Sequence, residues 1–265
     1  MRFASLGSGS EGNGLIVEAA AGSAVTRILL DCGFGLKETL RRLDRLGLDA
    51  DALDGILVTH EHGDHIGGVA RLARQHGIPV WMTHGTLAAA TPMLSAQSVR
   101  GTEGLDIRLI EQHQRFAIGA LEITPFPVPH DAREPAQYVF GDGARRLGVL
   151  TDLGSVTAHV KATLSGCDAL VLECNHDRAM LADGPYPERL KARVGGRFGH
   201  LDNGQAATLL ADLMHGGLRH VIAAHLSRQN NTAELARMAL AGALGCTPDW
   251  IGVADQDAGF GWRDA

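Results

Sequence analysis

The sequence has no apolar run long enough to cross a bilayer, which would take about 20 residues. Its start, Met1-Arg2-Phe3-Ala4-Ser5-Leu6-Gly7, lacks the long apolar region and the cleavage site of a signal peptide. Neither a transmembrane protein nor a secreted protein is indicated. We expect a cytoplasmic protein that has no membrane partner.

The chain also has few cysteines, scattered without a CxxC pair at Cys32, Cys167, Cys174 and Cys246. Because disulfide frameworks are typical of short secreted chains, we expect free or buried thiols. Tyrosine is scarcer still, with 2 residues against 13 histidines. Histidine is the commonest metal ligand, so this imbalance indicates a metal site.

The 265 residues predict one α/β domain, 1–265, with short buried strands and interspersed helices. Length alone allows one large domain or two small ones, but no low-complexity linker divides the chain. Apolar runs rich in β-branched residues predict strands at Leu15–Glu18, Arg27–Asp31, Gly55–Thr59, Pro79–Thr83, Leu121–Pro125, Arg146–Thr151, Ala169–Glu173 and His220–Ala224. Helical spacing predicts helices at Leu36–Leu46, Ile66–His76, Thr157–Leu164, Asn203–Gly216 and Thr232–Ala243.

Three of these strands end directly in a residue that can bind a metal. His60 follows the strand 55–59, Asp152 follows 146–151, and His225 follows 220–224. Scaffolds usually build a site from such groups, carried on loops over a rigid sheet. We therefore expect the three strand ends to meet at one site.

The run His60-Glu61-His62-Gly63-Asp64-His65 offers three imidazoles and a carboxylate within six residues. These donors suit zinc, manganese or iron rather than calcium. On a tight loop His60 and His62 can share one metal, whereas Asp64 and His65 turn toward a second. The alternative is a histidine-rich surface loop, which a position straight after a buried strand disfavours.

This HxHxDH run is the signature of the metallo-β-lactamase superfamily, and the sequence resembles that superfamily beyond it. Pro129-His130-Asp131, Thr151-Asp152-Leu153-Gly154 and Ala224-His225-Leu226-Ser227 match its later ligand motifs. The resemblance implies a four-layer αββα sandwich, of class α/β (α+β). It also implies that Asp152 lies between two metals, one bound by His60, His62 and His130 and the other by Asp64, His65 and His225. The electron-transfer branch has glutamate at the position of His62, so histidine here favours hydrolysis.

Two metals about 3.5–4 Å apart lower the pKa of a shared water, so that hydroxide is available as a nucleophile. Asp64 and Asp152 would orient that nucleophile as well as bind metal. Asp31 ends the strand 27–31 and has two equal interpretations. It either fixes a histidine tautomer beside the metals or caps a helix or turn.

A glycine- and serine-rich loop, residues 5–13, precedes the first predicted strand. Its hydroxyls and backbone N–H groups suit a phosphate, although such residues also make ordinary hairpins. Its candidate substrate contacts are Ser8, Ser10 and Asn13.

In the phosphodiesterase branch of the superfamily, typified by ribonuclease Z, an acidic residue pairs with an extra histidine that serves the leaving oxygen. Glu173 and His200 resemble this pair, and His176 is a further catalytic candidate. The alternative is that His176 and His200 cap helices; for His200 the functional interpretation is favoured. The segment His225-Leu226-Ser227-Arg228 resembles the closing motif of that branch.

An insert near 176–202 is basic, although the chain carries a net charge of −6. Between residues 178 and 200 the sequence contains five basic and two acidic residues, which gives a local charge of +3. A solvated helical face is the default for a charge run, but here the run lies between two predicted site motifs. We interpret it as a lip that follows a phosphate backbone, with Arg193, Arg197 and, beyond it, Arg228 as contacts. Of aromatic residues only Tyr186 and Phe198 are near, which does not support base stacking.

In order, the motifs SLGSGSEGN, ILLDCGFG, THEHGDH, PVPHD, TDLG, LECNHD, LKARVGGRFGHLDN and HLSRQNN resemble the bacterial YycJ/WalJ family of metallo-β-lactamase-fold proteins. The resemblance implies a 5′-to-3′ DNA exonuclease linked to DNA repair, acting on double-stranded ends with a 5′-phosphate. It implies two divalent ions, manganese or zinc, and the donors also accept Fe²⁺. Asp202 is a departure, because the family more often has serine there.

Two other functions remain open. The first is a small-molecule phosphodiesterase, lactonase or thioesterase on the same metals. The second is a binding protein that keeps metals for stability, which the complete ligand set argues against.

Overall fold

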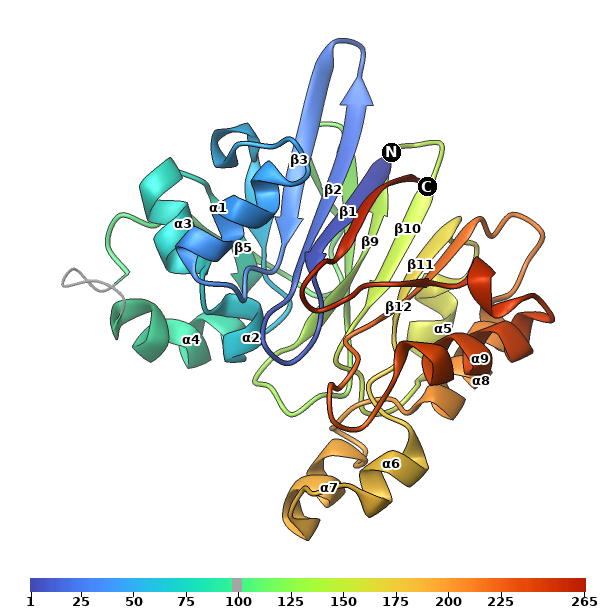
Figure 1. The fold of residues 1–265 in the computed structure, drawn as a ribbon. Helices are drawn as coiled ribbons and strands as arrows, with labels where there is room; N and C mark the ends of the chain where they lie inside the picture. The colour runs from blue at the N-terminus through green and yellow to red at the C-terminus, as the bar shows by residue number, and fades with distance from the viewer. Residues whose placement is uncertain (97–101) are drawn as a thin grey trace.

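Two sheets packed face to face form the centre of the molecule (Figure 1). The computed structural model describes residues 1–96 and 102–265. The first sheet has the order β14-β1-β2-β3-β4-β5-β6. Its strands are β1 (Arg2–Gly7), β2 (Gly14–Ala21), β3 (Ala24–Leu30), β4 (Gly55–Leu57), β5 (Val80–Thr83), β6 (Ile107–Ile110) and β14 (Phe260–Asp264).

The second sheet has the order β13-β12-β11-β10-β9-β8-β7. Its strands are β7 (Phe116–Ile118), β8 (Leu121–Pro127), β9 (Ala136–Gly141), β10 (Arg146–Leu150), β11 (Ala169–Glu173), β12 (His220–Ala224) and β13 (Gly252–Val253). In each sheet one half is parallel: β3 to β6 in the first and β10 to β13 in the second. The carboxyl ends of these parallel strands therefore gather at one edge of each sheet.

Helices cover the outer face of each sheet (Figure 1). Beside the first sheet are α1 (Leu36–Asp44), α2 (Gly63–Ile66), α3 (Val69–His76) and α4 (His84–Ala96). Beside the second are α5 (Ala158–Leu164), α8 (Asn203–Leu213) and α9 (Ala233–Leu244), while α6 (Arg178–Asp183) and α7 (Glu188–Val194) project from it. Across residues 1–96 and 102–265, none of the helices could span a bilayer.

Three apolar cores separate the layers, one between the sheets and one under each helical layer. Successive residues of a strand point to opposite faces. On β3, Ile28 packs between the sheets and Leu29 faces the helices. On β11, Val171 packs between the sheets and Leu172 faces the helices. Burial on both faces explains why these strands are continuous apolar runs. The predicted αββα sandwich of class α/β is confirmed.

The eight predicted strands are all present, and the bounds of β11 and β12 are as predicted, but the ends of others need correction. The strands expected to reach Asp31, Thr59 and Thr151 end one or two residues earlier, at Leu30, Leu57 and Leu150. The helix predicted over 66–76 is divided, because α2 ends at Ile66 and α3 begins at Val69. Gly68 lies at this break, where a Cβ would come 1.9 Å from the Phe34 carbonyl oxygen.

Candidate metal centre

The residues that the sequence predicted as metal ligands all meet where the parallel strands of the two sheets end. Three imidazoles form one cluster, His60, His62 and His130, and a second cluster contains Asp64, His65 and His225. Within each cluster the ligand atoms lie within 4.8 Å of one another. Asp152 joins both clusters: its Oδ2 lies 3.0 Å from His65 Nε2, and its Oδ1 lies 3.9 Å from His130 Nε2.

Unpaired buried atoms show that these residues fit a pair of cations. His60 Nε2 and Asp152 Oδ2 are buried, and neither makes a hydrogen bond. A buried polar atom without a partner is costly and calls for an explanation such as an ion. Both atoms point into the cluster, and imidazole with carboxylate is a donor set for zinc, manganese or iron. Two divalent ions would satisfy these atoms.

The charges of the centre favour this chemistry. Burial lowers the pKa of His60, and the neighbouring His65 lowers it further, so that the His60 ring stays neutral. Burial alone would raise the pKa of the Asp64 and Asp152 carboxyls, but the surrounding histidines hold both below their usual range. The aspartates are therefore ionised and can bind a cation.

Asp31 fixes the tautomers of His65 and, through Thr59, of His60 by hydrogen bonds on the Nδ1 side of each ring. Its Oδ2 accepts a hydrogen bond from His65 Nδ1 at 2.8 Å and another from Thr59 Oγ1 at 2.9 Å. The Thr59 hydroxyl, having donated to Asp31, accepts from His60 Nδ1 at 3.0 Å. Each ring thus keeps its Nε2 lone pair for a metal. The alternative that Asp31 caps a helix or turn is wrong, because its two carboxylate oxygens bind Thr59 and His65, and the adjacent helix α1 has Gly35 as its N-cap.

Three residues of the centre adopt a left-handed backbone. Asp31, Asp152 and His225 have φ values of 59°, 56° and 55°, and within the described ranges they are the non-glycine residues with positive φ. Such a conformation costs about 1–3 kcal/mol per residue. Each follows a parallel strand, β3, β10 or β12, and the sharp turn directs its side chain across the sheet edge. The strained backbone residues therefore lie at the ligand clusters, and two of them, Asp152 and His225, are candidate ligands.

Glu173, at the end of β11, contacts two histidines of the centre. Its Oε1 lies 2.7 Å from His200 Nδ1 and 3.2 Å from His225 Nδ1. Its Oε2 accepts hydrogen bonds from the backbone N–H groups of Leu153 and Leu201. The structure therefore brings the predicted pair Glu173 and His200 into contact. The capping alternative for His200 is wrong, because α8 is capped by Asp202.

The contacts of Asp202 explain why aspartate can stand at a position where the family more often has serine. Its carboxylate accepts from the backbone N–H of Gln205, while the Gln205 side chain accepts from the Asp202 backbone N–H. This capping box uses an acceptor oxygen, which aspartate and serine both supply.

Among the described residues His176, predicted as a catalytic residue, lies outside the ligand clusters, and its catalytic role stays a prediction. Its ring is buried with Nδ1 3.4 Å from Asn175 Oδ1, and its Nε2 lies toward Gly195 of the insert. The capping alternative is wrong, since Asp177 is the N-cap of α6.

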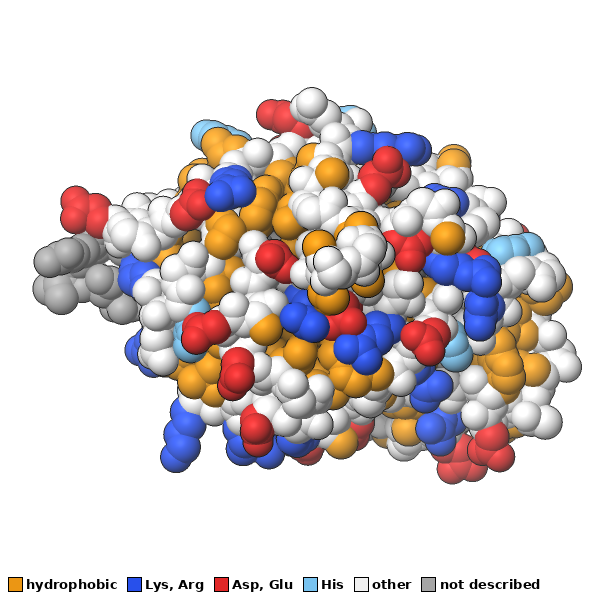
Figure 2. All heavy atoms as spheres, turned by 90° about the horizontal axis from the view of Figure 1, so that it is seen from above, with side chains coloured by type: hydrophobic (Ala, Val, Ile, Leu, Met, Phe, Trp, Pro, Cys, Tyr) orange, Lys and Arg blue, Asp and Glu red, His pale blue; other side chains and the backbone are white. Residues whose placement is uncertain are grey.

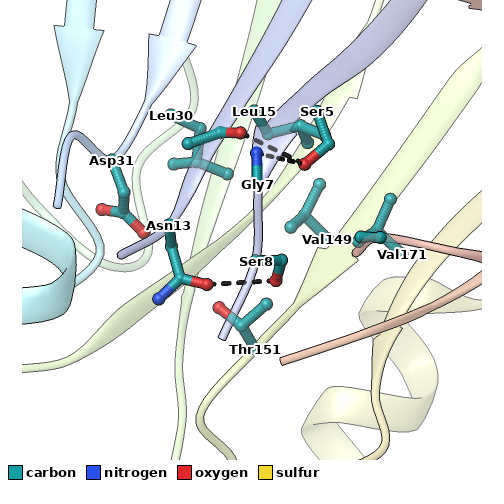
Figure 3. A pocket seen from close by; sticks show the side chains of 12 residues that line it. Ser5, Gly7, Ser8, Asn13, Leu15, Leu30, Asp31, Val149, Thr151 and Val171 are labelled. Atoms are coloured by element: carbon teal, nitrogen blue, oxygen red, sulfur yellow. Dashed lines mark hydrogen bonds between the residues drawn. The ribbon is translucent and has the colours of Figure 1, made fainter. Parts of the chain in front are cut away.

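Ser8 and Asn13, the predicted phosphate contacts, are buried beside the second ligand cluster, and their side chains hydrogen-bond to each other (Figure 3). The Ser8 hydroxyl donates to Asn13 Oδ1 at 3.0 Å and accepts from the His225 backbone N–H at 3.0 Å. Asn13 Nδ2 donates to the Asp64 carbonyl oxygen at 3.2 Å and lies 3.1 Å from His65 Nε2. Both residues thus hold ligand loops together. Ser10, by contrast, is exposed.

The three predicted arginines occupy different surroundings. Arg193 of α7 pairs with Asp131 at 2.6 Å, and Asp131 Oδ1 lies 3.4 Å from His130 Nε2. Arg197 is exposed on the same insert. Arg228 pairs with two carboxylates, Glu11 at 3.1 Å and Asp257 at 2.7 Å, which offset its charge.

Sequence reasoning assigned no role to Asp131 or Thr59, although both contact ligands. The available signal was their position, because Asp131 directly follows the ligand His130 and Thr59 directly precedes His60. An adjacent polar side chain on a ligand loop is a natural source of outer hydrogen bonds.

Known proteins resemble this chain in sequence and in fold. The family described as "Beta-lactamase superfamily domain" matches residues 26–226. Exodeoxyribonuclease YycJ of Bacillus anthracis is 37% identical over 92% of this chain and 89% of its own length. Exodeoxyribonuclease WalJ of Streptococcus pneumoniae is 31% identical over 95% and 91%. Ribonuclease Z of Bradyrhizobium diazoefficiens is 35% identical over 50% of this chain and 44% of its length.

The solved structure of Zn²⁺-bound PqqB from Methylobacterium extorquens superposes on the whole chain with a TM-score of 0.76 at 18% identity, and all of that chain is covered. At this identity the likeness supports the fold alone. The two exodeoxyribonucleases go further, because each is more than 30% identical to this chain over about nine tenths of both lengths. The chain belongs to the metallo-β-lactamase superfamily and, within it, to the family of the YycJ and WalJ exodeoxyribonucleases.

Proposed function

We propose that this protein is a metal-dependent exodeoxyribonuclease that hydrolyses phosphodiester bonds from DNA ends in the 5′-to-3′ direction. One observation carries the proposal: the Glu173–His200 pair lies against the ligand clusters, with His200 Nδ1 3.5 Å from Asp152 Oδ1. The names of the full-length relatives supply the substrate class. The proposed cofactors are two divalent ions, manganese or zinc, and the proposed compartment is the cytoplasm.

Two divalent ions, when bound by the two clusters, supply the Lewis acidity that activates water and offsets charge on a phosphoryl group. The protein side chains position these ions. Asp152, whose carboxylate reaches both clusters, would help to hold both ions. Asp31 and the carbonyl oxygen of Gly199, 3.1 Å from His130 Nδ1, fix ring orientations.

His200 is placed to protonate the leaving group. When the P–O bond breaks, the departing sugar oxygen needs a proton, because an alkoxide has a pKa far above 7. Burial lowers the pKa of His200, but the adjacent Glu173 outweighs this effect and the net shift is upward. The ring is therefore protonated more readily than an ordinary histidine. With Nδ1 directed at Glu173, Nε2 can give its proton to the oxygen.

The surface charges support a polyanionic substrate at this end of the molecule. The exposed Arg193 and Arg197 lie on the insert beside the clusters, and cations of this kind bind phosphates. The opposite end, viewed from the tip of the β2–β3 hairpin, intersperses basic and acidic side chains (Figure 2). The insert is thus the better place for a DNA backbone.

The decisive test uses purified protein loaded with Mn²⁺ or Zn²⁺ on end-labelled duplex DNA, with and without a 5′-phosphate. We expect stepwise loss from the 5′ end, and none with the His65→Ala variant. His76→Ala is the matched control, since His76 pairs with Asp51 at 2.6 Å on the surface. Turnover of a simple phosphodiester or a lactone without any DNA cleavage would instead indicate a small-molecule hydrolase.

A further inference from the structure

The end of the insert, residues 197–200, is bound directly to the loops that carry metal ligands. Three successive carbonyl oxygens accept hydrogen bonds from those loops. The Arg197 oxygen accepts from Ser155 Oγ at 3.1 Å, that of Phe198 from the Asp131 N–H at 2.9 Å, and that of Gly199 from His130 Nδ1 at 3.1 Å. The backbone here is therefore fixed relative to the centre.

Gly154 of the Asp152 loop packs against the same segment. A Cβ at Gly154 would lie 2.5 Å from the Cα of Phe198 and 2.4 Å from the Arg197 carbonyl oxygen. This close approach leaves no side chain between the ligand loop and the insert. The position of Phe198 is thus set from two sides.

The Phe198 side chain itself is 57% exposed, more than any other large apolar side chain in the described residues. Single exposed apolar residues are common and usually need no explanation. Phe198 differs because its backbone is fixed and it stands two residues before His200, within about 7 Å along the chain. Contact with a flat apolar ligand would remove this aromatic ring from water, which lowers the free energy.

Two exposed arginines of the insert lie near Phe198 in the sequence. Arg197 is the preceding residue and is exposed, and Arg193 of α7 pairs with Asp131, whose N–H also holds the Phe198 carbonyl oxygen. Exposed aromatic side chains together with cations are the combination by which proteins bind single-stranded nucleic acid. The rings of bases stack on the aromatic face while the cations contact phosphates.

We propose that Phe198 stacks on an unpaired base next to the scissile phosphate and so holds the DNA end open at the metal centre. The inference rests on the proposed nuclease function and adds how the end is recognised. Because every base has a π-face, such a contact binds ends without regard to sequence. It would also separate the terminal nucleotide from its partner strand before cleavage.

The test compares Phe198→Ala, Phe198→Trp and the wild type, all metal-loaded, on duplexes that carry either a normal or an abasic nucleotide at the cleaved end. With normal ends we expect kcat/KM to fall about 5- to 150-fold in Phe198→Ala, the loss typical of a stacking aromatic. Phe198→Trp should keep near-wild-type values. On abasic ends the wild type should lose the same factor and Phe198→Ala nothing further.

A second readout follows stacking directly. Terminal 2-aminopurine should lose fluorescence on mixing with the wild type, before any cleavage, and should not do so with Phe198→Ala. Met238→Ala is the control, since Met238 is 55% exposed on α9. Equal rates for Phe198→Ala and wild type on normal ends would overturn the proposal, as would an equal loss on abasic ends. If the wild type fails to cleave duplex DNA at all, the proposed function fails and this inference with it.

Discussion

Oε1 of Glu173 lies 2.7 Å from Nδ1 of His200, on a carboxylate that is entirely buried. The same oxygen lies 3.2 Å from Nδ1 of His225, a member of the second ligand cluster. One carboxylate therefore orients both a metal ligand and the proposed proton donor. Burying it is tolerable because its two oxygens together accept from these histidines and from two backbone N–H groups.

The first prediction concerns the proton donor. His200→Ala should lower kcat on DNA by about 10²- to 10⁴-fold, the usual contribution of general acid catalysis. On bis(p-nitrophenyl) phosphate the loss should be much smaller, since nitrophenolate leaves without a proton. Steady-state kcat values for the two substrates decide the matter. Equal losses on both would assign His200 to metal positioning instead.

The second prediction concerns the residue behind the metal ligands. Asp31→Asn should weaken metal binding by about 10- to 100-fold, because the amide no longer fixes the Nδ1–H tautomers of His65 and, through Thr59, of His60. Competition against a chromophoric chelator measures the affinity. Asp51→Asn is the matched control, because the exposed Asp51 pairs with His76, which belongs to none of the ligand clusters of the described residues. Similar affinities for both variants would exclude this role of Asp31.

The metal centre could be predicted from the sequence because its ligands are polar residues of metal-binding type that directly follow apolar strands. Imidazoles and carboxylates follow runs that are apolar throughout, and those runs are the strands buried on both faces, such as β10 and β11. Edge strands have no such signal: β6 exposes its two central residues, Arg108 and Leu109, and the sequence did not predict it. Burial on both faces helped but was not sufficient, because β9 is buried along almost its whole length and was not predicted either.

Other features depend on distant contacts that no local pattern records. His176 and His200 both lie near predicted motifs, yet only His200 meets the buried Glu173. The loop 5–13 has the composition of a surface loop, but Ser8 and Asn13 are buried because His225 and Asp64 supply their partners. The exposed ring of Phe198 became meaningful only once Asp131 and Gly154 were seen to hold its backbone.

A third prediction concerns the cysteines. Burial raises the pKa of Cys32 to about 12 and that of Cys167 to about 11, and it raises that of Cys174 further. Thiolates are the reactive form, so these three should resist a disulfide reagent in the native protein. Cys246 is only partly buried and should react. Titration with DTNB should therefore find one thiol in the native chain and four after unfolding; Cys246→Ser should abolish the native signal.

The fourth prediction tests whether the insert must be held in place. Gly154→Ala puts a methyl group within 2.5 Å of the backbone of Arg197 and Phe198, which must move away. Because the same segment carries His200, we expect DNA cleavage to fall about 100-fold, as a small misplacement can cause. Hydrolysis of bis(p-nitrophenyl) phosphate should fall much less, since it needs no proton donor and the Gly154 substitution reaches the ligand His130 only through the Gly199 carbonyl oxygen.

Gly242→Ala is the control for this substitution. Gly242 lies within α9, where an added Cβ would meet nothing within 4 Å, so alanine should stabilise the helix by about 1 kcal/mol and leave both activities unchanged. A thermal melt of each variant separates the two effects, because Gly154→Ala should retain a cooperative transition. If Gly154→Ala cleaved DNA like the wild type, the contact between the Asp152 loop and the insert would have no part in catalysis. If it lost both activities together, the displacement would have reached the ligand clusters rather than the insert alone.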